Sequence, residues 1–430
     1  MLRVMPRAVA RSVLLPFPAQ KTFSTGQAFS PARGKMGGVL EGLRVIDFTR
    51  VIAGSWCTMY LSDMGAEVLK IEAPGIGDVM RVQTPQKNGE CGFFIIYNRG
   101  KKSITLDLKK EEAKQIVREL VSTSDVLVEN FSPGTMKELG LDHDAMKKIN
   151  PKLVYASISG YGQFGPKADL PSYDVCIQAM SGLMSMNGYR GMDPLRIGMS
   201  ATDFMAGTVT ALAVMGALWN SKKTGKGQYI DISLFDCGLT MLENAVPKYS
   251  WTGEVATALG SRHPSAAPHN VYKTRDGFIV IITIENKAYA RLCKAMGMPE
   301  LMEDPRFKEV SGRLKNVDDL DGIVNSWTGK LPTAKVVEAL KASNLAYGVV
   351  RNVKEVVEDE HSKVRNMIVS VRQPKAGPVT IPGCPIHYSE TEIAPLRPAP
   401  LLGEHTEEIV TKILKYPKEK FAKLRKKGVF

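Results

Sequence analysis

Apolar and polar residues between positions 37 and 160 alternate in short blocks that predict strands and helices in turn. Short apolar runs bounded by turn residues are typical of buried strands, and longer runs with apolar positions three and four apart predict helices. The predicted strands are 43–47, 67–72, 103–108, 125–129 and 153–159, and the predicted helices are 56–63, 110–121 and 142–149. Such alternation indicates an α/β fold class, with a doubly wound, mostly parallel sheet in a Rossmann-like large domain.

The longest apolar stretch lies at 204–219, which contains no charged residue. We predict a helix that is buried on most of its faces. Its short length and its Gly and Thr content argue against a membrane span. Ser200, Thr202 and Asp203 precede it, and residues of these types cap helix starts.

Asp203 has two interpretations at this stage. It can close a variant capping box with Ser200, with Asp where Glu is usual. Alternatively, a carboxylate beside the free N–H groups of a helix start stays ionised and lies next to oxyanion donors, which suits a nucleophile. The local sequence does not decide between them.

Beyond this helix the pattern predicts a smaller α+β domain. The expected strands are 228–234, 278–284 and 348–351, the helices are 287–296, 318–328, 333–343 and 404–414, and 299–317 is a polar connector. Segments 373–385 and 394–404 are rich in Pro and Gly and predict irregular structure. We divide the chain into a leading segment at 1–35, a large domain at 36–225, a linker and small domain at 226–350, and a return to the large domain at 351–430.

Charge and composition narrow the functional classes. The formal net charge is +13, yet residues 1–35 carry six basic residues and no acidic one, which is typical of mitochondrial targeting. More positive charge lies at 412–427, and because no nucleic-acid motif accompanies it we expect no nucleic-acid partner. No stretch predicts a membrane span, so no membrane partner is expected.

Cofactor motifs are missing from the sequence pattern. The six cysteines and six histidines are scattered, which predicts reduced thiols and no metal site. The first predicted strand is not followed by Gly-x-Gly-x-x-Gly, which argues against a nicotinamide-dependent dehydrogenase. We expect no bound cofactor.

Several motifs resemble those of the class III CoA-transferases. They lie at 47–51, 65–72, 98–103, 130–134, 157–162, 173–174, 223–227 and 400–406. The resemblance covers 38–430, and it implies an enzyme that moves CoA from an acyl-CoA, such as succinyl-CoA, to a free acid, such as the dicarboxylate glutarate. It also implies an interlocked homodimer, with acyl-CoA and small acids as its other partners, and the leading segment places it in the mitochondrial matrix.

The resemblance assigns roles to particular residues. The nucleophilic aspartate of the family falls on Asp203, which would form an aspartyl anhydride and then an aspartyl-CoA thioester. The implied CoA contacts are Ile52, Ala53, Leu106, Asp107, Leu108, Lys109, Asn130, Phe131, Ser132, Ser172, Tyr173 and Asp174. Candidates to hold the distal carboxylate of the acceptor are Arg99, Arg196 and Arg262, because a guanidinium fork matches a carboxylate.

Some positions depart from the family pattern. Ile52 replaces the Gln of formyl-CoA transferases, which argues against formate and oxalate as substrates. Ala73 and Glu138 stand where some members have Arg near the CoA phosphates, so the sequence points instead to Lys101, Lys102 or Arg81.

Two other functions remain open from the sequence. The 2-methylacyl-CoA racemases of the same family place a His base directly before the position of Asp174, whereas this chain has Tyr173, whose ordinary pKa is high for a base. A non-catalytic CoA-binding scaffold would keep the loops without needing Asp203.

Overall fold

The computed structural model describes residues 37–430, and its centre is a parallel sheet of six strands. The strand order is β5-β2-β1-β6-β7-β8, and every neighbouring pair is parallel. The strands are β1 (Arg44–Asp47), β2 (Glu67–Glu72), β5 (Lys102–Thr105), β6 (Val126–Glu129), β7 (Val154–Ser159) and β8 (Tyr229–Ser233). This confirms the predicted doubly wound α/β fold. The chain order reverses between β1 and β6, which marks the topological switch point where such sheets bind ligands.

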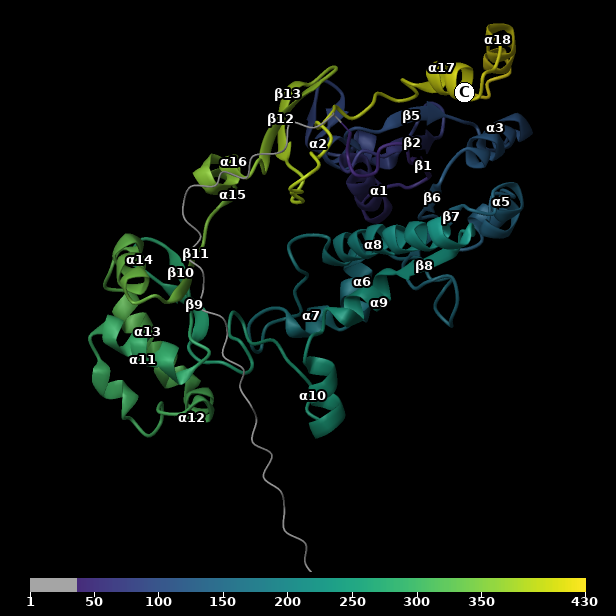
Figure 1. Cartoon of the computed structure of the whole chain (residues 1–430). Helices are drawn as coiled ribbons and strands as arrows, with labels where there is room; N and C mark the ends of the chain where they lie inside the picture. Colours follow the sequence, from purple (N-terminus) through teal and green to yellow (C-terminus); the bar gives the residue numbers. More distant parts are fainter. Residues whose placement is uncertain (1–36) are drawn as a thin grey trace, which may run out of the picture.

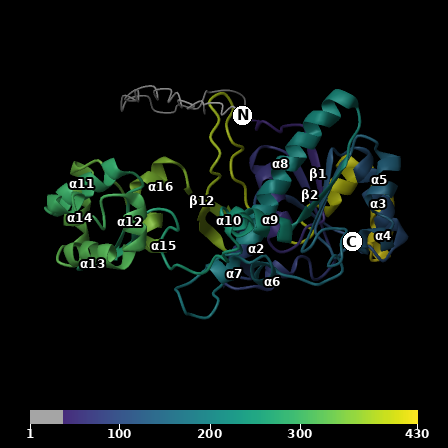
Figure 2. The same ribbon diagram turned by 90° about the horizontal axis from the view of Figure 1, so that it is seen from below.

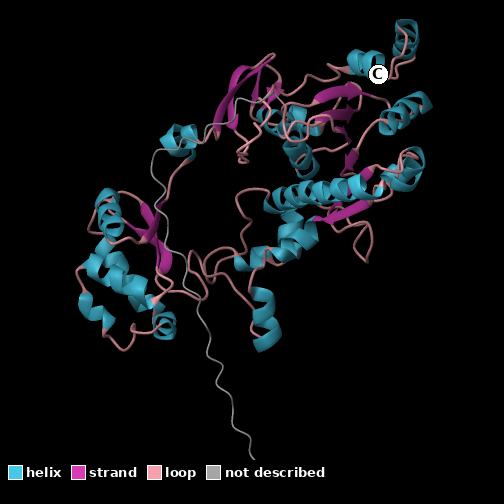
Figure 3. Ribbon diagram, viewed as in Figure 1, coloured by secondary structure: helices cyan, strands magenta, loops and turns pink. Residues whose placement is uncertain are grey.

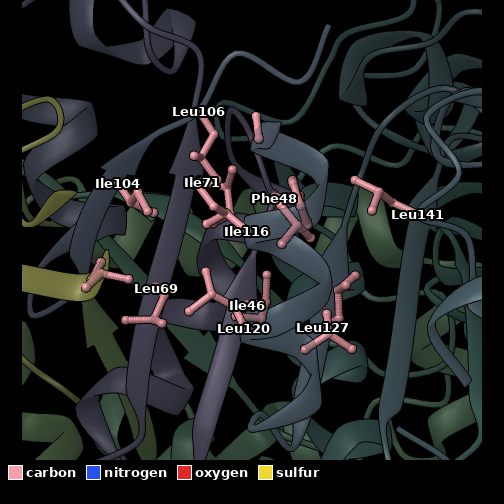
Figure 4. Close-up of a cluster of buried hydrophobic side chains, with 14 of the residues drawn as sticks. Ile46, Phe48, Leu69, Ile71, Ile104, Leu106, Ile116, Leu120, Leu127 and Leu141 are labelled. Carbon is pink, nitrogen blue, oxygen red and sulfur yellow. The ribbon is translucent and has the colours of Figure 1, made fainter. Parts of the chain in front are cut away.

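Helices cover both faces of this sheet. On one face, Ile116 and Leu120 of α3 (Glu111–Ser122) pack in one buried cluster with Ile46, Leu69 and Leu127 of the sheet (Figure 4). The same cluster includes residues of α5 (His143–Ile149), η3 (Ile409–Ile413) and α18 (Lys418–Lys426). The other face is covered by α1 (Ala53–Asp63), α8 (Ala201–Thr224) and α9 (Leu234–Thr240).

Helix α8 is longer than its sequence predicts. It runs for 24 residues and, among the described residues, it is long and apolar enough to cross a membrane, so the argument from its length was wrong. Here it packs on α1 and the sheet. Leu212 and Trp219 are nevertheless 72% and 63% exposed. Within 204–219 the exposed positions form a single stripe at 208, 212, 216 and 219, so the helix is covered on its other faces, as predicted. The spacing of apolar residues cannot identify the exposed face of a helix when that face is itself apolar.

A smaller domain is built on an antiparallel sheet of order β11-β10-β9 (Figure 3). Its strands are β9 (His269–Lys273), β10 (Phe278–Ile282) and β11 (Ala346–Val349), and its main helices are α11 (Asn286–Met296), α13 (Val317–Thr328) and α14 (Thr333–Ala342). It lies apart from the large sheet in both views (Figures 1 and 2). The domain boundary predicted at residue 225 falls before β8, the last strand of the large sheet.

The chain leaves the large domain after α10 (Ala245–Thr252) and returns through α15 (Val353–Glu358) and α16 (Glu360–Val364) (Figure 1). It then forms a hairpin of β12 (Ile368–Gln373) and β13 (Gly377–Pro382), where irregular structure was predicted from 373 onward. Because β13 has a single partner strand, its two prolines do not interrupt a second ladder. The segment predicted as a polar connector contains η2 (Pro299–Met302) and α12 (Val310–Lys315).

The remaining elements are short. They are η1 (Val79–Val82), β3 (Gln86–Lys87), β4 (Glu90–Cys91), α2 (Gly92–Asn98), α4 (Thr135–Glu138), α6 (Asp174–Met180), α7 (Leu183–Met186) and α17 (Thr406–Glu408). Helix α17 contacts β5, so the end of the chain lies on the large domain (Figure 1). The predicted targeting segment at 1–35 lies outside the described residues.

Candidate active site

Asp203 lies in the first turn of α8 and is partly buried. Ser200 is the N-cap residue, but neither it nor Asp203 makes a side-chain capping bond, so the capping-box interpretation was wrong. Among residues 37–430, the Asp203 carboxylate has no hydrogen-bond or ion-pair partner. Burial, together with the charge of Asp174, raises its pKa to about 7.

Asp174 supplies the cap instead, from the start of α6. Its Oδ1 accepts hydrogen bonds from the backbone N and the hydroxyl of Thr202, at 2.8 and 2.7 Å. Its Oδ2 accepts from Nε2 of Gln178 at 2.6 Å, and the same amide group bonds to the backbone of Ile197 and Met199. The segment that enters α8 is therefore held by α6, and the adjacent carboxylate of Asp203 is left free.

A glycine brings α8 close to the start of α1. A Cβ atom added at Gly207 would lie 2.4 Å from the carbonyl oxygen of Ala53 and 3.0 Å from Trp56. Only a residue without a side chain allows this approach. Ile52, the N-cap residue of α1, and Ala53 consequently lie beside the helix that carries Asp203.

The turn before α1 has a strained backbone. Val51 has a φ of 60°, a left-handed conformation that is rare for a β-branched residue. Its backbone N bonds to Oδ1 of Asp78 at 3.3 Å. Strain of this kind clusters at functional sites, where the surrounding structure maintains it.

Aromatic rings form one wall next to Asp203. The ring of Phe204, the following residue, lies 4.6 Å from Trp56 and 6.3 Å from Tyr97 between centroids. Burial and the charge of Asp203 raise the pKa of Tyr97 to about 12. Apolar walls exclude water from a reactive carboxylate. Sequence analysis missed Tyr97, because nothing in the local pattern links it to Asp203.

The loops after β1 and β6 meet at the switch point. Both backbone groups of Arg50 bond to the side-chain amide of Asn130, at 2.7 and 2.9 Å. The guanidinium of Arg50 lies 4.7 Å from the ring centroid of Phe131, and within the described chain it forms no ion pair. Sequence analysis included Arg50 in the motif at 47–51 without assigning it a role, although its position just after the first strand was a usable signal.

The other predicted CoA contacts occupy more varied positions. Leu106 is part of the hydrophobic core, and the backbone N of Asp107 bonds to the carbonyl of Val429 at 2.9 Å. Tyr173 is 74% exposed. Leu108 is partly buried, and Lys109, Ser132 and Ser172 are at least partly exposed. The segment 106–109 follows β5, two strands from β1, at the same carboxyl edge of the sheet.

The three arginines proposed for the acceptor acid lie in different surroundings. Arg99 is 2% exposed and forms a bidentate pair with Asp63, at 2.6 and 3.0 Å. Arg262 pairs with Asp318 and Asp321 of the small domain, both at 2.7 Å. Arg196 is exposed and bonds only to carbonyls of its own loop. Of the three, Arg196 alone has no carboxylate partner within residues 37–430.

The cations expected near the CoA phosphates are already neutralised. Lys101 pairs with Asp47, Lys102 with Glu67 and Glu408, and Arg81 with Glu72. Lys101 is fully buried, which lowers its pKa to about 8 despite the neighbouring Asp47. The expectation for these three residues is therefore not favoured, and Arg50 and Lys109 are the better-placed cations at the carboxyl edge. No group of three or more metal-ligating side chains occurs within 37–430.

Comparison with known proteins agrees with this arrangement. The sequence matches the model of "CoA-transferase family III" over residues 40–406. It is 36% identical to the succinyl-CoA:glutarate CoA-transferase of Mus musculus, over 91% of this chain and 90% of that one. It is 39% identical to the acetyl-CoA:oxalate CoA-transferase of Acetobacter aceti, over 87% of this chain and 95% of that one. A CAIB/BAIF family protein from Brucella suis has a similar structure, with a TM-score of 0.78 at 33% identity, covering 88% of this chain and all of that one. The chain therefore belongs to CoA-transferase family III and is a CoA-transferase.

Proposed function

We propose that this enzyme transfers CoA from succinyl-CoA to a dicarboxylate such as glutarate, with Asp203 as the covalent nucleophile. The observation that supports this most is that the two carboxylates at the start of α8 differ in their hydrogen bonding. Asp174 makes the capping bonds to Thr202, and Asp203 keeps an unpaired, partly desolvated carboxylate. A purely structural aspartate at a helix start would make those bonds itself.

The reaction uses the Asp203 carboxylate twice. It first attacks the thioester carbon of the acyl-CoA, so that the CoA thiolate leaves and a mixed anhydride remains. The thiolate then attacks Cγ of Asp203, which releases the first acid and leaves an aspartyl-CoA thioester. The second acid reverses these steps. The aromatic wall of Trp56, Tyr97 and Phe204 limits hydrolysis of these intermediates by water.

The CoA moiety would lie along the carboxyl edge of the sheet. Ile52 and Ala53 flank the nucleophile helix, and Asn130 fixes the loop beside them. Arg50 and Lys109, which form no ion pair within the described part of the chain, offer cations for the phosphates. Helix and strand ends at a switch point are favourable positions for such anions.

Arg196 is the best-placed of the three candidate arginines for the distal carboxylate of the acceptor. It lies in the loop that enters α8 and has no competing carboxylate within the described chain. Arg196→Ala should raise KM for glutarate about 10-fold or more, with little change for a monocarboxylate. Arg190→Ala, which removes an exposed charge from the same loop, serves as the control. An equal effect of both variants would remove Arg196 from the acceptor site.

A homodimer is part of the same proposal. Leu212 and Trp219 on α8 and Trp251 on α10, which is 84% exposed, are apolar side chains that residues 37–430 of one chain leave uncovered. Large exposed apolar residues commonly mark interfaces. Sedimentation analysis should give twice the chain mass.

We also propose that residues 1–35 direct the protein to the mitochondrial matrix, which an import assay with and without this segment tests.

The decisive assay combines transfer with trapping. Wild-type protein incubated with succinyl-CoA and glutarate should form glutaryl-CoA, and hydroxylamine should trap an adduct on Asp203. Asp203→Asn should abolish both. Exchange of an α-hydrogen of a 2-methylacyl-CoA without transfer would indicate a racemase, and CoA binding without either reaction would indicate a scaffold.

A further inference from the structure

We propose that the hydroxyl of Tyr97 donates a hydrogen bond to the carboxyl group of Asp203 while that group is acylated, an inference that rests on the proposed function. Tyr97 belongs to α2, far from α8 in the sequence, and its side chain is only 5% exposed.

Packing holds the Tyr97 ring in one place. Its centroid lies 6.0 Å from Trp56, 6.3 Å from Phe93 and 6.3 Å from Phe204. Phe204 directly follows Asp203, and Trp56 contacts Phe204 at 4.6 Å. The same cluster of rings therefore fixes both the tyrosine and the first turn of the nucleophile helix. A ring locked in this way positions its polar end at little entropic cost.

Two complementary groups beside this ring cluster lack partners within residues 37–430. The hydroxyl of Tyr97 forms no hydrogen bond among residues 37–430, and it is not one of the fully enclosed polar atoms, so it is free to donate to a group that forms during the reaction. The nearby Asp203 carboxylate likewise forms no hydrogen bond in the same part of the chain. Burial and, to a smaller extent, the charge of Asp203 raise the pKa of Tyr97 to about 12. Tyr97 is thus a protonated donor at every physiological pH.

The chemistry calls for a donor at this position. When the CoA thiolate attacks Cγ of the acylated Asp203, a C–S bond forms and the carbonyl electron pair moves onto the Asp203 oxygen. This oxyanion collapses when the C–O bond to the first acid breaks and the acid leaves as a carboxylate. Tyr97 would hydrogen-bond to the oxyanion and keep its own proton, so no proton transfer is needed.

A second tyrosine of the same cluster provides a matched control. Tyr60 packs edge-on against Trp56 at 5.1 Å between centroids. Its hydroxyl, however, lies near Asp63 and Cys384, on the side of Arg99. Tyr60→Phe therefore removes the same atom from the same aromatic cluster without changing the surroundings of Asp203.

Steady-state kinetics of Tyr97→Phe test the proposal. We expect kcat for CoA transfer to fall about 10- to 100-fold, the range for loss of a donor to a charged intermediate. KM for succinyl-CoA should stay within about twofold, because the ring remains and ground-state binding is unchanged. The acid limb of the pH–rate profile should stay in place, because burial and Asp174, and not Tyr97, shift the pKa of free Asp203. Tyr60→Phe should match the wild type in all three measurements.

The outcomes separate this inference from the proposed function. If Asp203→Asn abolishes transfer while Tyr97→Phe keeps the wild-type kcat, the role of Tyr97 is refuted and the nucleophile stands. If Asp203→Asn retains full transfer, the proposed mechanism fails first. A thermal midpoint of Tyr97→Phe equal to that of the wild type, together with the lower kcat, excludes a folding defect as the cause.

Discussion

Asp203→Asn should make the protein more stable at alkaline pH while it abolishes transfer. Asp203 carries an unpaired charge in a partly buried site, and its pKa rises from 3.8 in the unfolded chain to about 7. An asparagine of nearly the same shape never carries that charge. The catalytic group is thus predicted to cost stability, as strained or desolvated active-site residues commonly do.

The size and sign of the effect follow from this pKa. The folded protein binds the Asp203 proton more tightly than the unfolded chain, so stability falls as the pH rises from about 4 to about 7 and then levels off. At about 1.4 kcal/mol per pKa unit, the full cost is roughly 4 kcal/mol. Solvent that reaches the partly exposed carboxylate reduces it, so we expect the asparagine variant to gain about 2–4 kcal/mol at pH 8.

Guanidinium unfolding followed by tryptophan fluorescence measures this gain. The midpoints of wild type and Asp203→Asn should nearly coincide at pH 4 and separate progressively up to pH 8. Asp193→Asn, an exposed aspartate in the loop that precedes α8, should show no such pH-dependent difference. A variant that is less stable than the wild type at pH 8, or a stability difference that does not change with pH, would refute the reasoning.

Three further predictions concern the same region. The rate of CoA transfer should rise with pH through a midpoint near 7, because only ionised Asp203 attacks the thioester, and a midpoint near 4 in the pH–rate profile would contradict the raised pKa. Gly207→Ala should destabilise the protein by about 1–3 kcal/mol in denaturant unfolding and lower kcat, because the added Cβ meets the backbone of α1. Gly216→Ala in the same helix, which has open space around it, should instead stabilise the protein by about 0.5–1 kcal/mol. Arg99→Leu should lower the unfolding free energy by about 3–5 kcal/mol, because it leaves Asp63 buried and unpaired. The double variant with Asp63→Leu should recover much of this loss. A change in acceptor KM without loss of stability would return Arg99 to the substrate site.

Local sequence patterns were sufficient to predict the large sheet. The strand predicted at 67–72 has those bounds in the structure, and the neighbouring strands differ by one to three residues at their ends. Each is a short, apolar run whose burial depends on its own residues, and alternation with helices forces parallel pairing. The hairpin after α16 was missed because its sequence is rich in Pro and Gly, and its pairing depends on a partner strand and not on local preference.

The site depended on contacts between residues far apart in the chain. The motif resemblance pointed to Asp203, but the choice between helix cap and free carboxylate was made by Asp174, on another helix. The sequence made Arg99 a candidate ligand for the substrate, but in the structure it pairs with Asp63. Nothing in the sequence around Tyr97 indicated that it lies near Asp203.

The sequence by itself therefore determined the elements of the large sheet and their order, because these depend on residue type and short-range spacing. The position of the candidate nucleophile came from the motif resemblance. Which charges are paired and which remain free was decided only by the tertiary structure. Pairing depends on distances across the fold, and those distances decide whether a buried carboxylate is neutralised or left reactive.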